Sequence, residues 1–107
     1  MDSYTVSWTD SATYDLESII SYIKFDSIAT AKEVFFAIKH ECEQLNYMPE
    51  RKRVVPELQQ IGINHYRKII FKRWRIIFKI EKANVSVLAV MDSSRNIEDI
   101  LFQRLMR

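Results

Sequence analysis

Alternating apolar and polar residues near the start of the chain predict a strand. Tyr4, Val6 and Trp8 are separated by small polar residues, which is the period-two pattern of a half-buried strand. Two stretches with apolar residues at helical spacing follow, over residues 11–25 and from about residue 27 to Tyr47. Because only a short segment interrupts the helical pattern, these two helices are expected to form an antiparallel hairpin.

The ends of the two helices are indicated by capping residues. Asp10 or Ser11 can cap the first helix, and Asp26 or Ser27 can cap the second. Pro49 marks the end of the second helix, because proline cannot continue the hydrogen-bond ladder. These limits leave two or three residues for the link between the helices.

Beyond His65 the chain is rich in β-branched and aromatic residues, which favour strands. The runs HYRKIIF, RWRIIFKI and VSVLAVM fit three strands, with turns at Lys72-Arg73 and at Lys82-Ala83-Asn84. Such short turns indicate an antiparallel meander. Most of the aromatic side chains are expected in the core rather than on a base-stacking surface, including Phe35, Phe36, Trp74 and Phe78.

The order of elements predicts an α+β fold. Residues 50–63 are expected to be a connection, and Asn96 can cap a last helix whose apolar stripe includes Ile97 and Leu101. The order is therefore β-α-α-β-β-β-α, with a helical hairpin packed on a small, mainly antiparallel sheet and the helices on one face. A chain of 107 residues is expected to form a single domain over residues 1–107.

Composition excludes several classes of protein. A single cysteine, Cys42, rules out an internal disulfide, and with only two histidines a metal site is not expected. Cys42 lies on the apolar stripe of the second helix, where a buried, inert thiol is expected. No apolar run is long enough to span a membrane, and no signal peptide is recognisable. We expect a cytoplasmic protein without a cofactor and without a membrane partner.

Charge is distributed unevenly along the chain. Residues 1–50 carry nine acidic and three basic residues, whereas residues 51–79 carry nine basic residues and only Glu57 as an acid. This basic middle holds more positive charge than solubility requires, which indicates an anionic partner. The partner is either nucleic acid or an acidic protein segment.

Four segments, in this order and spacing, resemble one known family: SATYDLESIISYI, MPERKRVVPEL, HYRKIIFKRWRIIFKI and VSVLAVMDSSRNIEDILFQRL. The chain is similar to the RelE/ParE superfamily of bacterial type II toxin–antitoxin toxins, also called plasmid-stabilisation proteins. The resemblance implies a RelE/ParE-like fold and a toxin neutralised by a cognate antitoxin. Its target is expected to be DNA gyrase, as for members similar to ParE, or mRNA on the ribosome, as for members similar to RelE.

RNA cleavage would require a base, a cation on the phosphate and an acid. By resemblance, Arg75 and Arg95 match the arginines that stabilise the phosphate in RelE-like ribonucleases. The expected C-terminal tyrosine is missing, since Leu101 and Phe102 stand in that region and neither can donate a proton. His65, with Tyr66 beside it, is the remaining candidate for proton transfer.

These residues also have simpler interpretations. Arg75 can be a solvated strand residue, Arg95 can pair with Asp92 or Asp99, and His65 can be a strand-edge residue. As a group, the basic residues of the middle and last strands are candidates for binding the target or nucleic acid: Arg67, Lys68, Lys72, Arg73, Arg75 and Arg95.

Three functions remain open from the sequence. The first is a toxin similar to ParE that traps gyrase without performing chemistry, which the long hairpin and the missing tyrosine favour. The second is a ribosome-dependent endoribonuclease that uses Arg75 and Arg95. The third is an inactive member or a co-repressor that reaches operator DNA only through its antitoxin complex. A homodimer formed through the exposed helical face is left open.

Overall fold

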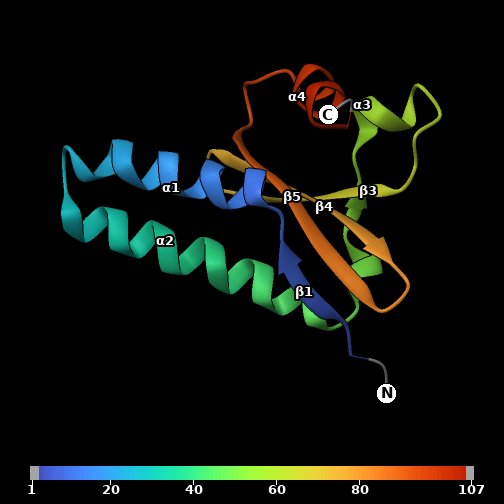
Figure 1. Cartoon of the computed structure of the whole chain (residues 1–107), viewed down its shortest axis with the longest axis horizontal. Coiled ribbons are helices and arrows are strands. Elements are labelled where there is room, and N and C mark those ends of the chain that lie inside the picture. Colours follow the sequence, from blue (N-terminus) through green and yellow to red (C-terminus); the bar gives the residue numbers. More distant parts are fainter. Residues whose placement is uncertain (1–2, 106–107) are drawn as a thin grey trace.

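The computed structural model describes residues 3–105, and its centre is a five-stranded sheet in the order β1-β5-β4-β3-β2 (Figure 1). β1 pairs with β5 in parallel, and the other neighbouring strands are antiparallel. The predicted strands and the mainly antiparallel sheet are therefore confirmed. The strands are β1 (Thr5–Trp8), β2 (Arg53–Val54), β3 (Tyr66–Phe71), β4 (Trp74–Glu81) and β5 (Asn84–Asp92).

The predicted helical hairpin is present and projects beyond the sheet (Figure 1). It consists of α1 (Asp10–Lys24) and α2 (Ile28–Glu43), and a link of three residues joins them. Two 3₁₀ turns, η1 (Gln44–Asn46) and η2 (Pro49–Arg51), continue the chain after α2. The second α-helix thus ends at Glu43, earlier than the predicted end near Tyr47. The remaining predicted helical residues form the tighter η1 turn.

The two helices begin at hydroxyl caps. Ser27 caps α2 as one of the two predicted residues, because its Oγ accepts a hydrogen bond from the Thr30 N–H at 3.1 Å. For α1 the cap is Thr9 rather than Asp10 or Ser11. Its Oγ1 accepts from the N–H of Ala12 at 3.1 Å, so the helix starts one residue earlier than the sequence indicated.

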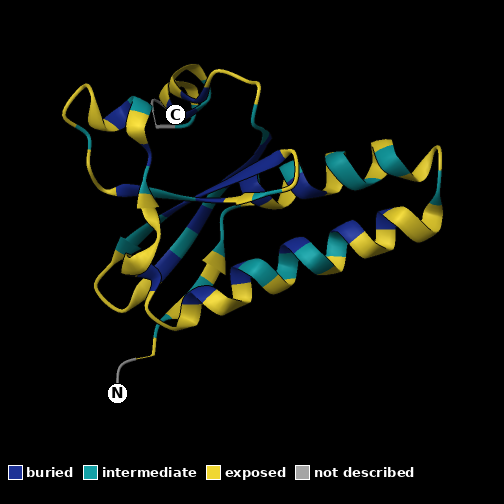
Figure 2. Cartoon of the chain, turned by 180° about the vertical axis from the view of Figure 1, so that it is seen from behind, coloured by how far each residue is buried: buried dark blue, intermediate teal, exposed yellow. Residues whose placement is uncertain are grey.

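The hairpin covers one face of the sheet. Alternate residues of β4 point to this face, where Ile76 and Phe78 are fully buried against Ile38 of α2. Leu16 of α1 and Val87 of β5 belong to the same cluster. Figure 2 shows buried positions concentrated in the strands and along one side of each hairpin helix. This cluster is the core that the apolar periodicity predicted.

The opposite face of the sheet is also covered, which corrects the prediction of helices on one face only. The remaining helices are α3 (Pro56–Gln59) and α4 (Ile97–Leu105). A second cluster contains Leu58 of α3, Ile97 and Leu101 of α4, and Ile77 and Met91 of the sheet. Because β4 and β5 are apolar on both faces, they can be covered from both sides.

The region expected to be a connection, residues 50–63, is partly structured. It contains β2 and α3, and Val55 between them is completely buried. Proline at the first position of α3 is compatible with a helix start, since its missing N–H would have no partner there. The prediction of a plain connection is therefore wrong for this segment.

Of two α2 side chains predicted to be buried, Cys42 is in the core and Phe36 is not. Cys42 is completely buried, and desolvation raises the pKa of its thiol to about 12, so the thiol stays protonated and inert at neutral pH. Phe36, in contrast, is 66% exposed, and its placement in the core is wrong. Its ring contacts Phe35, which is half-buried.

Among the described helices, none is long and apolar enough to cross a membrane.

Candidate functional site

Arg75 is held inside the molecule by an acid from another element. β4 turns its side chain toward α3, where Nη1 donates to Oε2 of Glu57 at 2.9 Å. A second donor, Nη2, reaches the Ser93 carbonyl oxygen at 3.4 Å. Only 11% of the Arg75 side chain is exposed. The interpretation of Arg75 as a solvated strand residue is therefore wrong.

The charge of Glu57 is maintained by this contact. Burial alone would raise the pKa of the Glu57 carboxyl, but the hydrogen bond and charge of Arg75, with a backbone hydrogen bond, lower it below its ordinary value. The pair is not completely satisfied, because Arg75 Nε and Glu57 Oε1 are buried and find no hydrogen-bond partner among the described residues. The guanidinium is thus occupied by a structural contact.

His65 lies at the far end of the sheet from Arg75. Its exposed ring packs against Tyr66, with 4.5 Å between ring centroids, just before β3 begins. The register pairs Tyr66 with Lys79 and Ile70 with Arg75. Five residues of strand therefore separate the levels of His65 and Arg75, which is about 16 Å. The structure does not bring these two candidates together.

Three other predicted residues meet at a groove between the hairpin and the end of the sheet. Lys72 and Arg73 form the β3–β4 turn, Arg95 follows β5, and all three line this groove of about 690 Å³. Two tyrosines of α1, Tyr14 and Tyr22, contribute exposed rings. The other lining residues are Asp15, Ser18, Ile19, Ile23, Asp26, Ser27, Thr30, Val34, Trp74, Val90, Met91 and Asp92.

Within this groove Arg73 and Arg95 differ in their partners. Arg73 binds Asp92 Oδ2 through Nε at 2.9 Å and Nη2 at 2.7 Å. The hydroxyl and backbone N–H of Ser94, followed by Arg73, hold the pKa of Asp92 well below its usual range. The side chain of Arg95 forms no ion pair within residues 3–105, so the pairing with Asp92 or Asp99 is not found. Arg95 and Lys72 are the exposed cations of the groove that form no ion pair with a described residue.

Arg67 and Lys68 line a separate pocket of about 380 Å³ at the β2 edge of the sheet. The six predicted binding residues thus divide into three places. Lys72, Arg73 and Arg95 are at the groove, Arg67 and Lys68 are at the β2–β3 edge, and Arg75 is in the interior. In the described part of the chain, no cluster of three or more histidine, cysteine or acidic residues could hold a metal ion.

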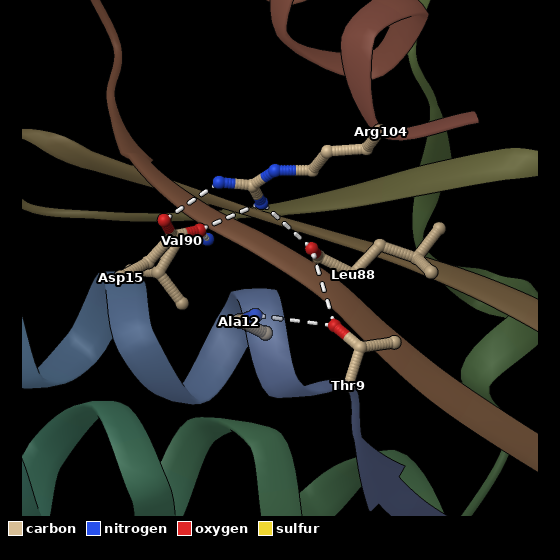
Figure 3. Close-up of polar contacts among 6 residues, drawn as sticks. All are labelled: Thr9, Ala12, Asp15, Leu88, Val90 and Arg104. Atoms are coloured by element: carbon tan, nitrogen blue, oxygen red, sulfur yellow. Dashed lines mark hydrogen bonds and ion pairs between the residues drawn. The ribbon is translucent and has the colours of Figure 1, made fainter. Parts of the chain in front are cut away.

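Sequence reasoning missed the contact that joins α1, α4 and β5 (Figure 3). Both nitrogens at the end of Arg104 bind the Asp15 carboxylate, at 2.8 and 2.7 Å, and Arg104 also donates to the Leu88 carbonyl oxygen at 2.8 Å. Asp15 Oδ2 in turn accepts from the N–H of Val90 at 3.0 Å. Leu88 is the extra residue of a β-bulge beyond the end of β1, so these side chains complete the free edge of β5.

Nothing in the sequence distinguishes Asp15 from the exposed acids of α1. Its partner Arg104 is 89 residues away and comes from α4 on the opposite face of the sheet, from where it reaches Asp15 past the β5 backbone at Leu88. The pair fixes the wall of the groove, since Asp15 and Val90 both line it. Its role is to position the groove rather than to react.

The arrangement as a whole is suited to binding. The groove offers exposed tyrosine rings and an exposed arginine, whereas His65, Arg75 and Arg95 do not form one reaction centre. Aromatic and arginine side chains are the residue types enriched where proteins bind each other. This geometry favours a protein-binding surface.

Comparisons with known proteins agree with this fold. A family model described as the ParE toxin of the type II toxin–antitoxin system parDE matches residues 6–97. A solved chain of the chromosomal ParDE toxin–antitoxin system from P. aeruginosa has a TM-score of 0.69 and 15% identity, over 83% of this chain and 95% of that chain. At this identity the likeness concerns the fold. No curated protein matches the sequence. Because the family model spans most of its residues, the chain belongs to the ParE toxin family of type II toxin–antitoxin systems.

Proposed function

We propose that this toxin inhibits DNA gyrase by binding it and performs no chemistry of its own. Membership of the ParE family supports the toxin identity and a cognate antitoxin as partner. The observation that carries the binding mechanism is the Arg75–Glu57 pair, because it removes the guanidinium on which a ribonuclease site would depend.

The ribonuclease alternative is less well supported by the geometry. Cleavage needs a base and an acid on either side of a bound phosphate, within hydrogen-bond reach. His65 is about 16 Å from the level of Arg75 along the strand direction. On α4, Leu101 is buried and Phe102 is exposed, and neither side chain can carry a proton.

The groove between the hairpin and the sheet is our candidate for the gyrase-binding surface. Tyr14 and Tyr22 supply large, stiff side chains, and Arg95 and Lys72 supply positive charge at the same place. We propose that the antitoxin covers this groove, so that neutralisation is occlusion. Recognition of the operator sequence would then come through the antitoxin in the complex, and the site of action would be the cytoplasm.

A homodimer, if one forms, would use the apolar side of the hairpin. Ile28 and Phe36 are exposed on α2, and with Phe35, Ala31 and Ile20 they line a shallow apolar groove of about 550 Å³. Sedimentation velocity on the free toxin and on a Phe36→Lys variant tests this. A dimer that the substitution converts to a monomer supports the proposal, and a dimer that persists in the Phe36→Lys variant contradicts it.

Supercoiling of relaxed plasmid by purified gyrase tests the proposed function. We expect the toxin to inhibit supercoiling and Arg95→Glu to require at least about tenfold more protein, since a buried interface arginine is worth more than about 1.4 kcal/mol. Lys82→Glu, in the exposed β4–β5 turn and outside the groove, is the charge-matched control. Unchanged supercoiling contradicts the proposal.

A parallel measurement separates the alternatives. Primer extension on cellular mRNA after induction of the toxin alone should show intact transcripts. Cuts at codon-spaced positions that disappear when translation is blocked would establish a ribonuclease. Intact mRNA in cells that grow normally would identify an inactive member or a co-repressor.

A further inference from the structure

A second basic site lies on the sheet edge opposite β1. Two residues of β2 or just before it, Lys52 and Arg53, and two of β3, Arg67 and Lys68, surround the pocket of about 380 Å³. The remaining lining comes from Val54, Pro56 and Gln59. We call these four basic residues the edge cluster.

Strand pairing brings the edge cluster together from distant parts of the sequence. The antiparallel register places Arg53 beside Lys68 and Val54 beside Arg67. Arg67 Nη1 donates to the Lys52 carbonyl oxygen at 2.7 Å, which holds the residue before β2 against β3. The backbone positions of the four basic residues are therefore fixed relative to each other by strand pairing.

The charge of the edge cluster is not neutralised by ion pairs. Over residues 3–105, none of its four side chains forms an ion pair. The charge of Lys68 helps to lower the pKa of the Glu57 carboxyl. Glu57 is not an ion-pair partner of Lys68, however, because Glu57 Oε2 accepts a hydrogen bond from Arg75. Four adjacent cations without acid partners repel each other, so an anion bound among them relieves this repulsion.

We propose that the edge cluster binds the phosphate backbone of double-stranded DNA. Lysine and arginine are the side chains that bind phosphates, and β2 is the last strand of the sheet, where an elongated ligand has access. The proposal is independent of gyrase as the target, because it concerns a contact of the toxin itself with DNA.

The chemistry of the pocket favours this ligand over a protein segment or a single strand. Peptide segments dock through apolar side chains that fill pockets, and here only Val54 and Pro56 are apolar. Single-stranded nucleic acids stack their bases on aromatic rings, and the pocket lining contains none. A duplex presents closely spaced phosphates and needs neither feature.

Fluorescence anisotropy with a short labelled duplex of mixed sequence tests the proposal over a range of salt concentrations. If all four side chains contact phosphates, log K should fall against log salt with a slope of about −3.5, or roughly 100-fold between 50 and 200 mM. The variant Arg53→Glu/Lys68→Glu should reduce the slope by about 2. The single variants Lys68→Glu and Lys82→Glu change the net charge equally and serve as a matched control pair, because Lys82 is exposed in the β4–β5 turn and does not line the pocket.

Each possible outcome either supports or overturns the proposal. A loss in the edge variant with binding retained in the control supports the proposal. Equal losses in both variants would mean a non-specific charge effect, and no binding by the wild type would mean no DNA site; both overturn the proposal. If the edge variant loses affinity for the antitoxin but not for the duplex, an acidic protein segment occupies the site instead. Arg53→Gln/Lys68→Gln repeats the test if the charge reversal does not fold.

Discussion

The basic residues of this chain behave differently in two regions. Arg73, Arg75 and Arg104 each bind a carboxylate of their own chain, whereas Arg53 and Lys68 at the sheet edge bind none within residues 3–105. All of them are strand, turn or helix residues with the same charge. The difference shows that the position of the acids, rather than the basic residue itself, separates structural cations from those available to a ligand.

The largest effect on stability is expected at Asp15. Asp15→Ala removes both hydrogen bonds to Arg104 and the one to the Val90 N–H, and leaves the Arg104 side chain, of which only 23% is exposed, without its acid partner. We expect a loss of about 3 kcal/mol in the free energy of unfolding, measured by urea denaturation. Glu17→Ala, an exposed acid on the same helix, is the control. Equal small losses would show that the pair is not structural.

A smaller loss is expected at Glu57. Glu57→Ala leaves Arg75 buried and unpaired, and because 36% of the Glu57 side chain is exposed we expect a loss of about 2 kcal/mol. The double variant Glu57→Leu/Arg75→Met should recover to within about 1 kcal/mol of the wild type, since no buried charge remains. Urea denaturation of the single and double variants measures the coupling. Additive losses would contradict it.

Acid should weaken the contacts of Glu57 with Arg75 and of Asp92 with Arg73 and Ser94. The pKa of Glu57 and that of Asp92 are lowered in the folded chain, so their stabilisation is present above the unfolded values near 4 and is lost as the pH falls through the folded values. Urea midpoints should therefore decrease below about pH 4. Glu57→Gln should show a shallower decrease than the wild type. An identical pH profile in the variant would exclude Glu57 as a contributor.

The smallest effect on stability is expected at the sheet edge. Arg53→Gln and Lys68→Gln remove charges without an acid partner, so each should change the free energy of unfolding by less than about 0.5 kcal/mol. The same denaturation assay measures this. A loss as large as that of Glu57→Ala would mean that the edge cluster is structural, and the comparison between the two regions would fail.

Local pattern was sufficient to predict most of the fold. Tyr4 and Trp8 mark β1 through alternation, and the short turns at Lys72 and Lys82 follow from the two apolar runs on either side of each. The second turn is one residue shorter than predicted, because Asn84 already pairs with Glu81 as the first residue of β5. Both lysines adopt positive φ angles, 53° and 57°, which a two-residue hairpin requires. These features depend on residues that are close together in the sequence, so the local sequence pattern is enough to predict them.

The sites depend on distant neighbours and were less predictable. Arg75 is separated from Glu57 by 18 residues and Arg104 from Asp15 by 89, so spacing alone could not pair them. The packing of α3 on the second face of the sheet was not predicted, because Pro56 and Gly62 made the segment around α3 resemble a loop. The candidate list still contained Arg95, whose charge and position after the last strand place it at the groove.

The parallel pairing of β1 with β5 has a consequence for how the toxin is made. Thr9 and Leu88 are in contact although 79 residues separate them. At about 5–20 residues per second, a ribosome needs roughly 4–16 seconds to deliver the second strand after the first. Throughout that interval the nascent hairpin lacks the sheet that forms the other wall of its groove. A growing chain therefore has no complete groove until translation has passed Arg95.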